Sequence, residues 1–113
     1  MKICLIGSTR FMPLYIETNR RLSVAGHIVY TVAQVSSESA LTKSELSAKD
    51  KEVLDLVHLR KILESDVVVL VTDETGYFGE STGRELLWAQ INGKKIFSCR
   101  DKIKPAIDRG IFG

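Results

Sequence analysis

The chain has 113 residues, about the length of one ordinary domain, which excludes a second domain of similar size. Apolar residues make up 44% and charged residues 27%, and the mean hydropathy is +0.03, which excludes a disordered or membrane-spanning chain. Sixteen basic and 14 acidic residues leave a net charge of +2, and because they are scattered we expect neither a nucleic-acid polymer nor a membrane as partner.

Four short apolar runs predict a parallel β-sheet. The runs are rich in β-branched residues and do not alternate with polar residues, which is typical of strands that are buried on both faces. They span residues 3–6, 28–32, 67–71 and 96–97.

Three segments between these strands are predicted to be helical. Apolar positions recur at helical spacing over 14–25, before a stop at Gly26, and a second helix ends near residue 64. A third covers 81–92. The polar segment 33–49 shows no clear period, and we expect it to be a loop that closes as a lid.

This alternation predicts one α/β domain over residues 1–113, a doubly wound sheet of the flavodoxin-like or Rossmann-like kind with helices on both faces. Right-handed crossovers give the strand order 2-1-3-4, and a fifth short element is expected near the C-terminus. Ligands of such sheets bind at the carboxyl ends of the strands, where the order reverses between strands 1 and 3.

The two cysteines indicate a reducing compartment. Cys4 and Cys99 lie in or beside apolar runs, as reduced core thiols do. The N-terminus lacks the apolar core of a signal peptide, so we expect a cytoplasmic protein. No His, Cys, Asp and Glu spacing resembles a metal site, and we expect no metal.

The loop after the first strand carries Gly7, Ser8, Thr9 and Arg10. The glycine permits a close backbone approach, the two hydroxyls and amides lie at a helix start, and the arginine offers a bidentate fork, a combination that suits one phosphate group. The alternative is that Ser8 or Thr9 only caps the helix. Because no dinucleotide or P-loop fingerprint is present, a monophosphate is the expected anion.

Glu85 is the principal catalytic candidate, and two interpretations of it are open. A carboxylate in a first helical turn at the crevice could attack or stabilise an electron-poor sugar carbon. The segment from Thr82 to Glu85 also fits a capping box, in which Glu85 bonds back to the Thr82 amide, and spacing alone favours that cap.

Other candidates lie around the same crevice. Asp73 directly follows the third strand, and Tyr77 and Phe78 could stack on a base or pack back onto the domain. His58 lies on an apolar stripe of the second helix, where it could transfer protons or simply be packed and hydrogen-bonded.

The sequence resembles the nucleoside 2-deoxyribosyltransferase superfamily over nearly its whole length. The resemblance rests on Gly7 to Arg10, on 65–69, on Gly79-Glu80-Ser81-Thr82 with Glu85 and Ala89, and on 93–96. It is greatest to the small branch that contains the deoxynucleoside 5'-monophosphate N-glycosidases.

That resemblance implies a flavodoxin-like, usually dimeric protein without a cofactor, in which Glu85 is the nucleophile on C1' of a (deoxy)nucleotide. It also implies that Ser8 and Arg10, in the loop after the first strand, hold the 5'-phosphate together with Ser81. Gly79 and Thr82, beside Ser81, are further candidate binding residues. The implied activity is hydrolysis of the N-glycosidic bond of a 2'-deoxynucleoside 5'-monophosphate. The alternatives are base exchange by a deoxyribosyltransferase and a non-catalytic nucleotide-binding module.

One position departs from the family pattern. Counting back from Asp66, the family's active-site aspartate falls on His58. An imidazole could protonate a departing base or activate water, but it does not reproduce an anionic partner. Asp55, three residues earlier, is expected to reach the same space from the same helix face.

Overall fold

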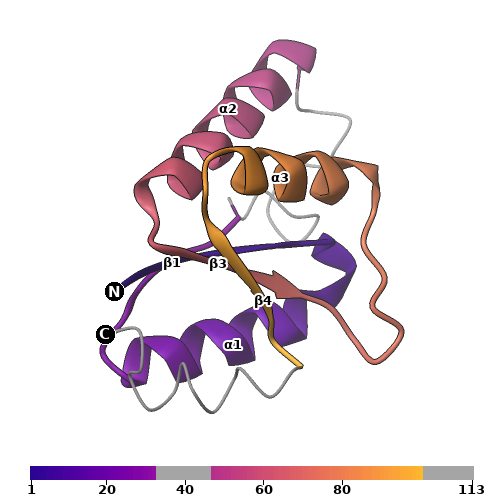
Figure 1. Ribbon diagram of the computed structural model, residues 1–113. Coiled ribbons are helices and arrows are strands. Elements are labelled where there is room, and N and C mark those ends of the chain that lie inside the picture. Colours follow the sequence, from indigo (N-terminus) through magenta and orange to yellow (C-terminus); the bar gives the residue numbers. More distant parts are fainter. Residues whose placement is uncertain (33–46, 101–113) are drawn as a thin grey trace.

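The computed structural model describes residues 1–32 and 47–100, and its elements follow the predicted alternation (Figure 1). The expected fifth element and residues 33–46 of the expected lid lie outside the described residues. The described elements are β1 (Lys2–Gly7), a 3-10 turn η1 (Thr9–Phe11), α1 (Met12–Val24), β2 (Ile28–Tyr30), α2 (Ala48–Glu64), β3 (Val67–Val71), α3 (Glu80–Ile91) and β4 (Lys95–Ser98).

The four described strands form one parallel sheet in the order β2-β1-β3-β4, which confirms the predicted order. β1 pairs with β3 along five residues, from Ile3 opposite Val67 to Gly7 opposite Val71. β2 is shorter than predicted, since it ends at Tyr30 opposite Cys4. Among the described strands it pairs with β1 alone. The carboxyl ends of β1 and β3 therefore meet at the predicted switch point.

Helices cover both faces of the sheet, as expected: α1 lies on one face, and α2 and α3 lie side by side on the other (Figure 1). Each face has its own apolar core. On the α1 face the buried side chains include Ile3, Leu5, Tyr15, Leu22, Val67, Val69 and Val71. On the α2 and α3 face they are Cys4, Ile6, Ile62, Val68 and Ala89. Both cysteines are free and buried.

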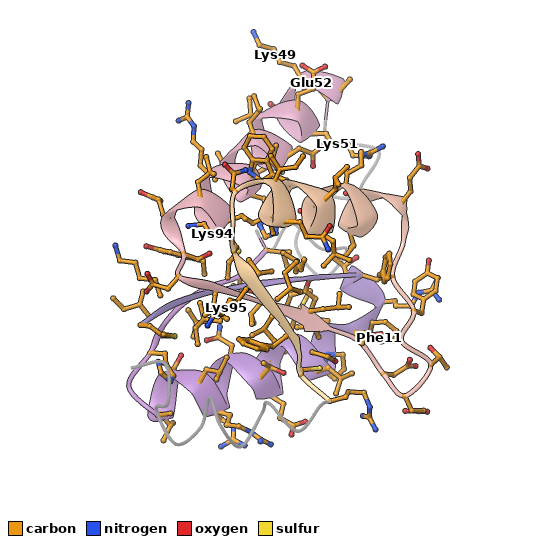
Figure 2. The ribbon with its side chains drawn as sticks, viewed as in Figure 1. Phe11, Lys49, Lys51, Glu52, Lys94 and Lys95 are labelled. Carbon is orange, nitrogen blue, oxygen red and sulfur yellow. The ribbon has the colours of Figure 1, made fainter. Side chains whose placement is uncertain are left out.

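α2 begins earlier than the apolar pattern predicts. Ser47 and Asp50 form a complete capping box, in which the Ser47 hydroxyl accepts from the Asp50 amide at 3.0 Å and the Asp50 carboxylate accepts from the Ser47 amide. Residues 48 and 49, expected in the loop, are therefore helical. The first turn carries Lys49, Lys51 and Glu52, which project from the end of the helix (Figure 2), so it has no apolar period to reveal it.

The other end of α2 is fixed by Lys94 (Figure 2). Its ammonium group donates to the carbonyl oxygens of Leu63 and Ser65 at 2.9 and 2.7 Å, which satisfies acceptors that the helix end leaves without partners. This contact ties the turn before β4 to the end of α2 and fixes how α2 lies beside α3. None of the described helices is long and apolar enough to cross a membrane.

Candidate active site

The start of α3 decides between the two interpretations of Glu85. The helix begins with Gly79 as its N-cap, and the Gly83 amide donates to the Gly79 carbonyl at 3.0 Å. Thr82 is therefore inside the first turn and only 3% exposed. The predicted capping box of Thr82 and Glu85 was wrong, because the helix starts three residues before it. Glu85 lies in the second turn, where no cap occupies its carboxylate.

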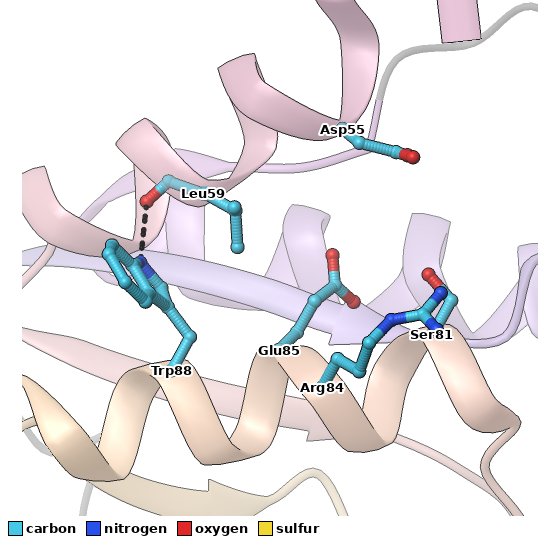
Figure 3. A pocket seen from close by; sticks show the side chains of 6 residues that line it. All are labelled: Asp55, Leu59, Ser81, Arg84, Glu85 and Trp88. Carbon is cyan, nitrogen blue, oxygen red and sulfur yellow. Dashed lines mark hydrogen bonds between the residues drawn. The ribbon is translucent and has the colours of Figure 1, made fainter. Parts of the chain in front are cut away.

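A cavity of about 260 Å³ opens between α2 and α3, and Glu85 points into it (Figure 3). Asp55 faces it from α2. Ser81 and Arg84 line the end near the start of α3, and at the other end the Trp88 indole donates to the Leu59 carbonyl at 3.3 Å. The cavity thus has a charged, hydroxyl-bearing end and an apolar end.

His58 lies against the Glu85 carboxylate from the side of α2. The His58 Nε2 and Glu85 Oε2 atoms are 3.2 Å apart, and both side chains are largely buried. The alignment falls short of a hydrogen bond, so neither ring nitrogen has a hydrogen-bond partner among the described residues. A buried imidazole without partners is costly unless another group completes it. His58 and Glu85 are therefore close enough to share a proton, and the His58 ring nitrogens can still donate or accept a hydrogen bond.

Burial sets the ionisation of this pair. It raises the pKa of Glu85 to about 7, with a further rise from the Asp55 charge and an opposing effect of Arg84. Burial also lowers the pKa of His58 to about 4, helped by Lys61 and opposed by Asp55. Near neutral pH, His58 is thus a neutral base and Glu85 is close to the midpoint of its titration. Perturbed pKa values are typical of catalytic sites, and of this pair Glu85 is the member that lines the cavity.

The loop after β1 takes the shape of a turn rather than an immediate α-helix. Ser8 caps η1, and its hydroxyl oxygen accepts from the Arg10 amide at 3.3 Å, whereas the N-cap of α1 is Phe11, which makes no side-chain cap bond. Thr9 opens that turn. Gly7 has a φ of +146°, and a Cβ there would lie 2.4 Å from the Val71 carbonyl oxygen. Only glycine fits where this loop leaves the sheet.

The loop after β3 contains Asp73 and Tyr77. Asp73 accepts from the Thr75 amide at 3.0 Å and from the Thr75 hydroxyl, and these bonds lower the pKa of its carboxyl group. The Tyr77 ring lies under the Arg10 guanidinium, whose central carbon is 4.0 Å from the ring centroid. The two predicted loops therefore contact each other at the switch point.

Tyr15 connects this edge of the sheet to Glu85. Its buried hydroxyl donates to the Gly7 carbonyl at 2.7 Å. Burial raises the pKa of Tyr15 strongly, and the Glu85 charge raises it further. Glu85 thus acts electrostatically on a side chain bonded to the end of β1. Of the residues predicted for the site, however, Glu85 and Ser81 line the cavity itself, and Asp55 joins them as expected.

Sequence reasoning missed Leu59, Arg84 and Trp88 as cavity residues. A signal for one of them was present, because Ser81, Glu85 and Trp88 follow the i, i+4, i+7 spacing of a single helix face. Leu59 is one residue from His58 and belongs to the apolar pattern of α2. Its contact with Trp88 required knowledge of how α2 packs on α3.

Two solved enzyme structures share this fold. The first is the 2-deoxyribosyltransferase of the psychrotolerant bacterium Bacillus psychrosaccharolyticus, with a TM-score of 0.65 and 20% identity over 95% of this chain and 80% of that one. The second is the CMP N-glycosidase of Clostridium botulinum, with a TM-score of 0.56 and 16% identity over the same shares. The expected resemblance is thereby confirmed at the level of the fold. No family model and no curated protein matches the chain.

Proposed function

We propose that this chain is a member of the nucleoside 2-deoxyribosyltransferase superfamily that hydrolyses the N-glycosidic bond of a 2'-deoxynucleoside 5'-monophosphate. The observation that carries the proposal is the Glu85 carboxylate, buried at a cavity and 3.2 Å from a buried, neutral His58. A carboxylate poised between charge states can attack a sugar carbon, and a neutral imidazole can accept a proton from water. The fold shared with two enzymes of nucleoside and nucleotide chemistry supports this assignment.

In the first step the Glu85 carboxylate attacks C1' of the sugar as the bond from C1' to the base nitrogen breaks. The base leaves with the bonding electron pair and takes up a proton from water, and a glycosyl ester of Glu85 remains. In the second step a water oxygen attacks C1' as the bond from C1' to the Glu85 oxygen breaks, and Glu85 leaves as a carboxylate. His58 accepts the proton of that water and passes it to solvent. Asp55 faces the cavity as the anionic group that His58 does not supply.

The phosphate is assigned to the switch-point loops. Arg10 supplies the charge, Ser8 and Ser81 supply hydroxyl groups, and Gly7 and Thr9 contribute close backbone amides. The proposed substrate site also includes Asp73, from the loop after β3, and Gly79 and Thr82, at the start of α3. Binding energy from the remote phosphate would orient C1' against Glu85.

The proposal includes a homodimeric cytoplasmic enzyme that uses no cofactor. Exposed apolar side chains on the outer surface of α2 and α3 support association, since Leu56, Leu87 and Ile91 are each more than half exposed. The light-scattering mass of the purified chain tests this part.

The phosphate assignment is tested by substituting Arg10 with Gln. Because the phosphate is the part of the substrate that the guanidinium is proposed to bind, we expect kcat/KM for a monophosphate to fall roughly tenfold to a hundredfold, while the free nucleoside is turned over as by the unchanged chain. Released base is followed by chromatography, with and without a second base as acceptor. Equal losses on both substrates would contradict the assignment. Exchange into the added base would make the activity that of a transferase.

The pH dependence of activity follows from the Glu85 pKa of about 7. The attacking form is the carboxylate, so kcat/KM is expected to rise with pH and to level off above pH 7, while His58 stays neutral across this range. Initial rates between pH 5 and 9 measure it. A rate that falls as pH rises through 7 would mean that Glu85 acts as an acid instead.

A further inference from the structure

Arg10 and Tyr77 connect the two loops of the switch point. The Arg10 guanidinium carbon lies over the Tyr77 ring at 4.0 Å from its centroid, within cation–π distance. Phe11, from the same turn as Arg10, meets that ring edge to face, with 6.2 Å between centroids and an interplanar angle of 70°. Figure 2 shows Phe11 beside the loop that leads from β3 to α3. Two consecutive residues of one loop therefore contact a single ring of the other.

The backbone of Tyr77 is held in place although the residue is 40% exposed. Its carbonyl accepts from the Thr72 hydroxyl at 2.7 Å, and Thr72 directly follows β3 and is buried. Its amide donates to the Thr75 hydroxyl at 3.2 Å. The ring is thus a fixed surface at the end of β3, against which a long flexible side chain can be ordered.

A ring contact suits an arginine that must also bind an anion. The N–H donors of a guanidinium lie in its plane, so contact through its face leaves them free to point elsewhere. Arginine loses considerable rotamer freedom when it is fixed, and ordering it before the ligand arrives removes that cost from binding. A carboxylate in place of Tyr77 would instead compete with the ligand for the same donors.

We infer that Tyr77 is a positioning residue that holds Arg10 ready for the 5'-phosphate, rather than a platform for the base. The inference rests on the proposed function, since it takes Arg10 to be the phosphate ligand. Arg10 covers one face of the ring, which is a surface that a stacked base would need, and Phe11 packs against the same ring. Phe78, 43% exposed and next in the chain, is left as the aromatic side chain that can cover a base.

The test compares Tyr77→Leu, which removes the ring, with Tyr77→Phe, which keeps it. Binding of a 2'-deoxynucleoside 5'-monophosphate and of its free nucleoside is measured by calorimetry, and kcat and KM are measured for both. We expect Tyr77→Leu to weaken monophosphate binding and raise its KM roughly two- to fivefold, with kcat and the nucleoside unaffected. Tyr77→Phe is expected to behave like the unchanged chain. In an Arg10→Gln background, Tyr77→Leu is expected to have no further effect.

Each other outcome has a defined meaning. Equal losses on nucleoside and monophosphate, or a loss that persists in the Arg10→Gln background, would show that Tyr77 contacts the base and would overturn the inference. Unchanged monophosphate binding by Tyr77→Leu would overturn it while leaving the proposed function intact. If the unchanged chain binds no monophosphate, the proposed function fails and the inference fails with it.

Discussion

Replacing Glu85 with Gln is expected to lower kcat at least about a thousandfold while the monophosphate still binds within a few-fold of its original affinity. The amide keeps the size of the side chain and its place in the cavity, but it cannot form the glycosyl ester. Turnover is measured as released base, and binding is measured by calorimetry. The matched control is Glu80→Gln, on the same helix but 89% exposed in its side chain and paired with exposed Arg84. That control is expected to retain full activity.

The pH dependence of the stability of Glu85→Gln shows whether the variant loses activity because it lacks the carboxylate or because it is misfolded. The folded state holds the Glu85 proton more tightly than the unfolded chain, because the pKa rises from 4.5 to about 7. Its contribution to stability is therefore fully present below pH 4.5 and is lost as pH rises through 7. Gln has no proton to lose, so burying it carries no cost of ionisation. Glu85→Gln is therefore expected to be more stable than the unchanged chain at pH 8, by as much as about 3 kcal/mol, and equally stable near pH 4. A variant destabilised at both pH values would contradict the assigned burial of Glu85.

Replacing Gly7 with Ala is expected to destabilise the fold by roughly 3 kcal/mol or more and to lower Tm by about 10 to 20 °C. The added Cβ would lie 2.4 Å from the Val71 carbonyl oxygen, where β1 and β3 pair, and the backbone φ of +146° is one that side chains rarely adopt. Neither strand can move away, because both are central in the sheet. Thermal unfolding followed by circular dichroism measures the loss.

Gly26 provides the matched control for Gly7. Its φ is +99°, yet a Cβ there would meet nothing within 4 Å. Gly26→Ala should therefore carry the backbone cost without the clash, about 1 kcal/mol. Equal losses of stability for the two variants would mean that the contact of the added Cβ with the Val71 carbonyl oxygen does not destabilise Gly7→Ala.

Most of the fold could be predicted because each described strand is a short apolar run and two of the helices end at a glycine. Gly26 and Gly93 both have positive φ and follow α1 and α3, and Gly26 is the predicted stop of α1. The errors lie where tertiary structure overrides the pattern. The first turn of α2 is charged and is fixed by the cap of Ser47, and β2 ends at Tyr30, where its pairing with β1 stops.

The site was less predictable, since its chemistry depends on how α2 packs against α3. The segment from Thr82 to Glu85 satisfies the spacing of a capping box, and only the true start at Gly79 shows that Glu85 is free of it. His58 contacts Glu85 because α2 packs against α3, and residue spacing does not reveal that packing. The shifted pKa values of His58 and Glu85 come from burial, which spacing does not reveal either. Conversely, the expected place of Asp55 followed from helical geometry alone.

Release of free base is the measurement that tests the central claim most directly. The purified chain and its Glu85→Gln variant are incubated with a panel of 2'-deoxynucleoside and ribonucleoside 5'-monophosphates and the free nucleosides, and the products are separated by chromatography. We expect the unchanged chain to release base from a 2'-deoxynucleoside 5'-monophosphate and the variant to release none. No release from any substrate, while a monophosphate still raises Tm, would identify a binding module and contradict the catalytic role of Glu85.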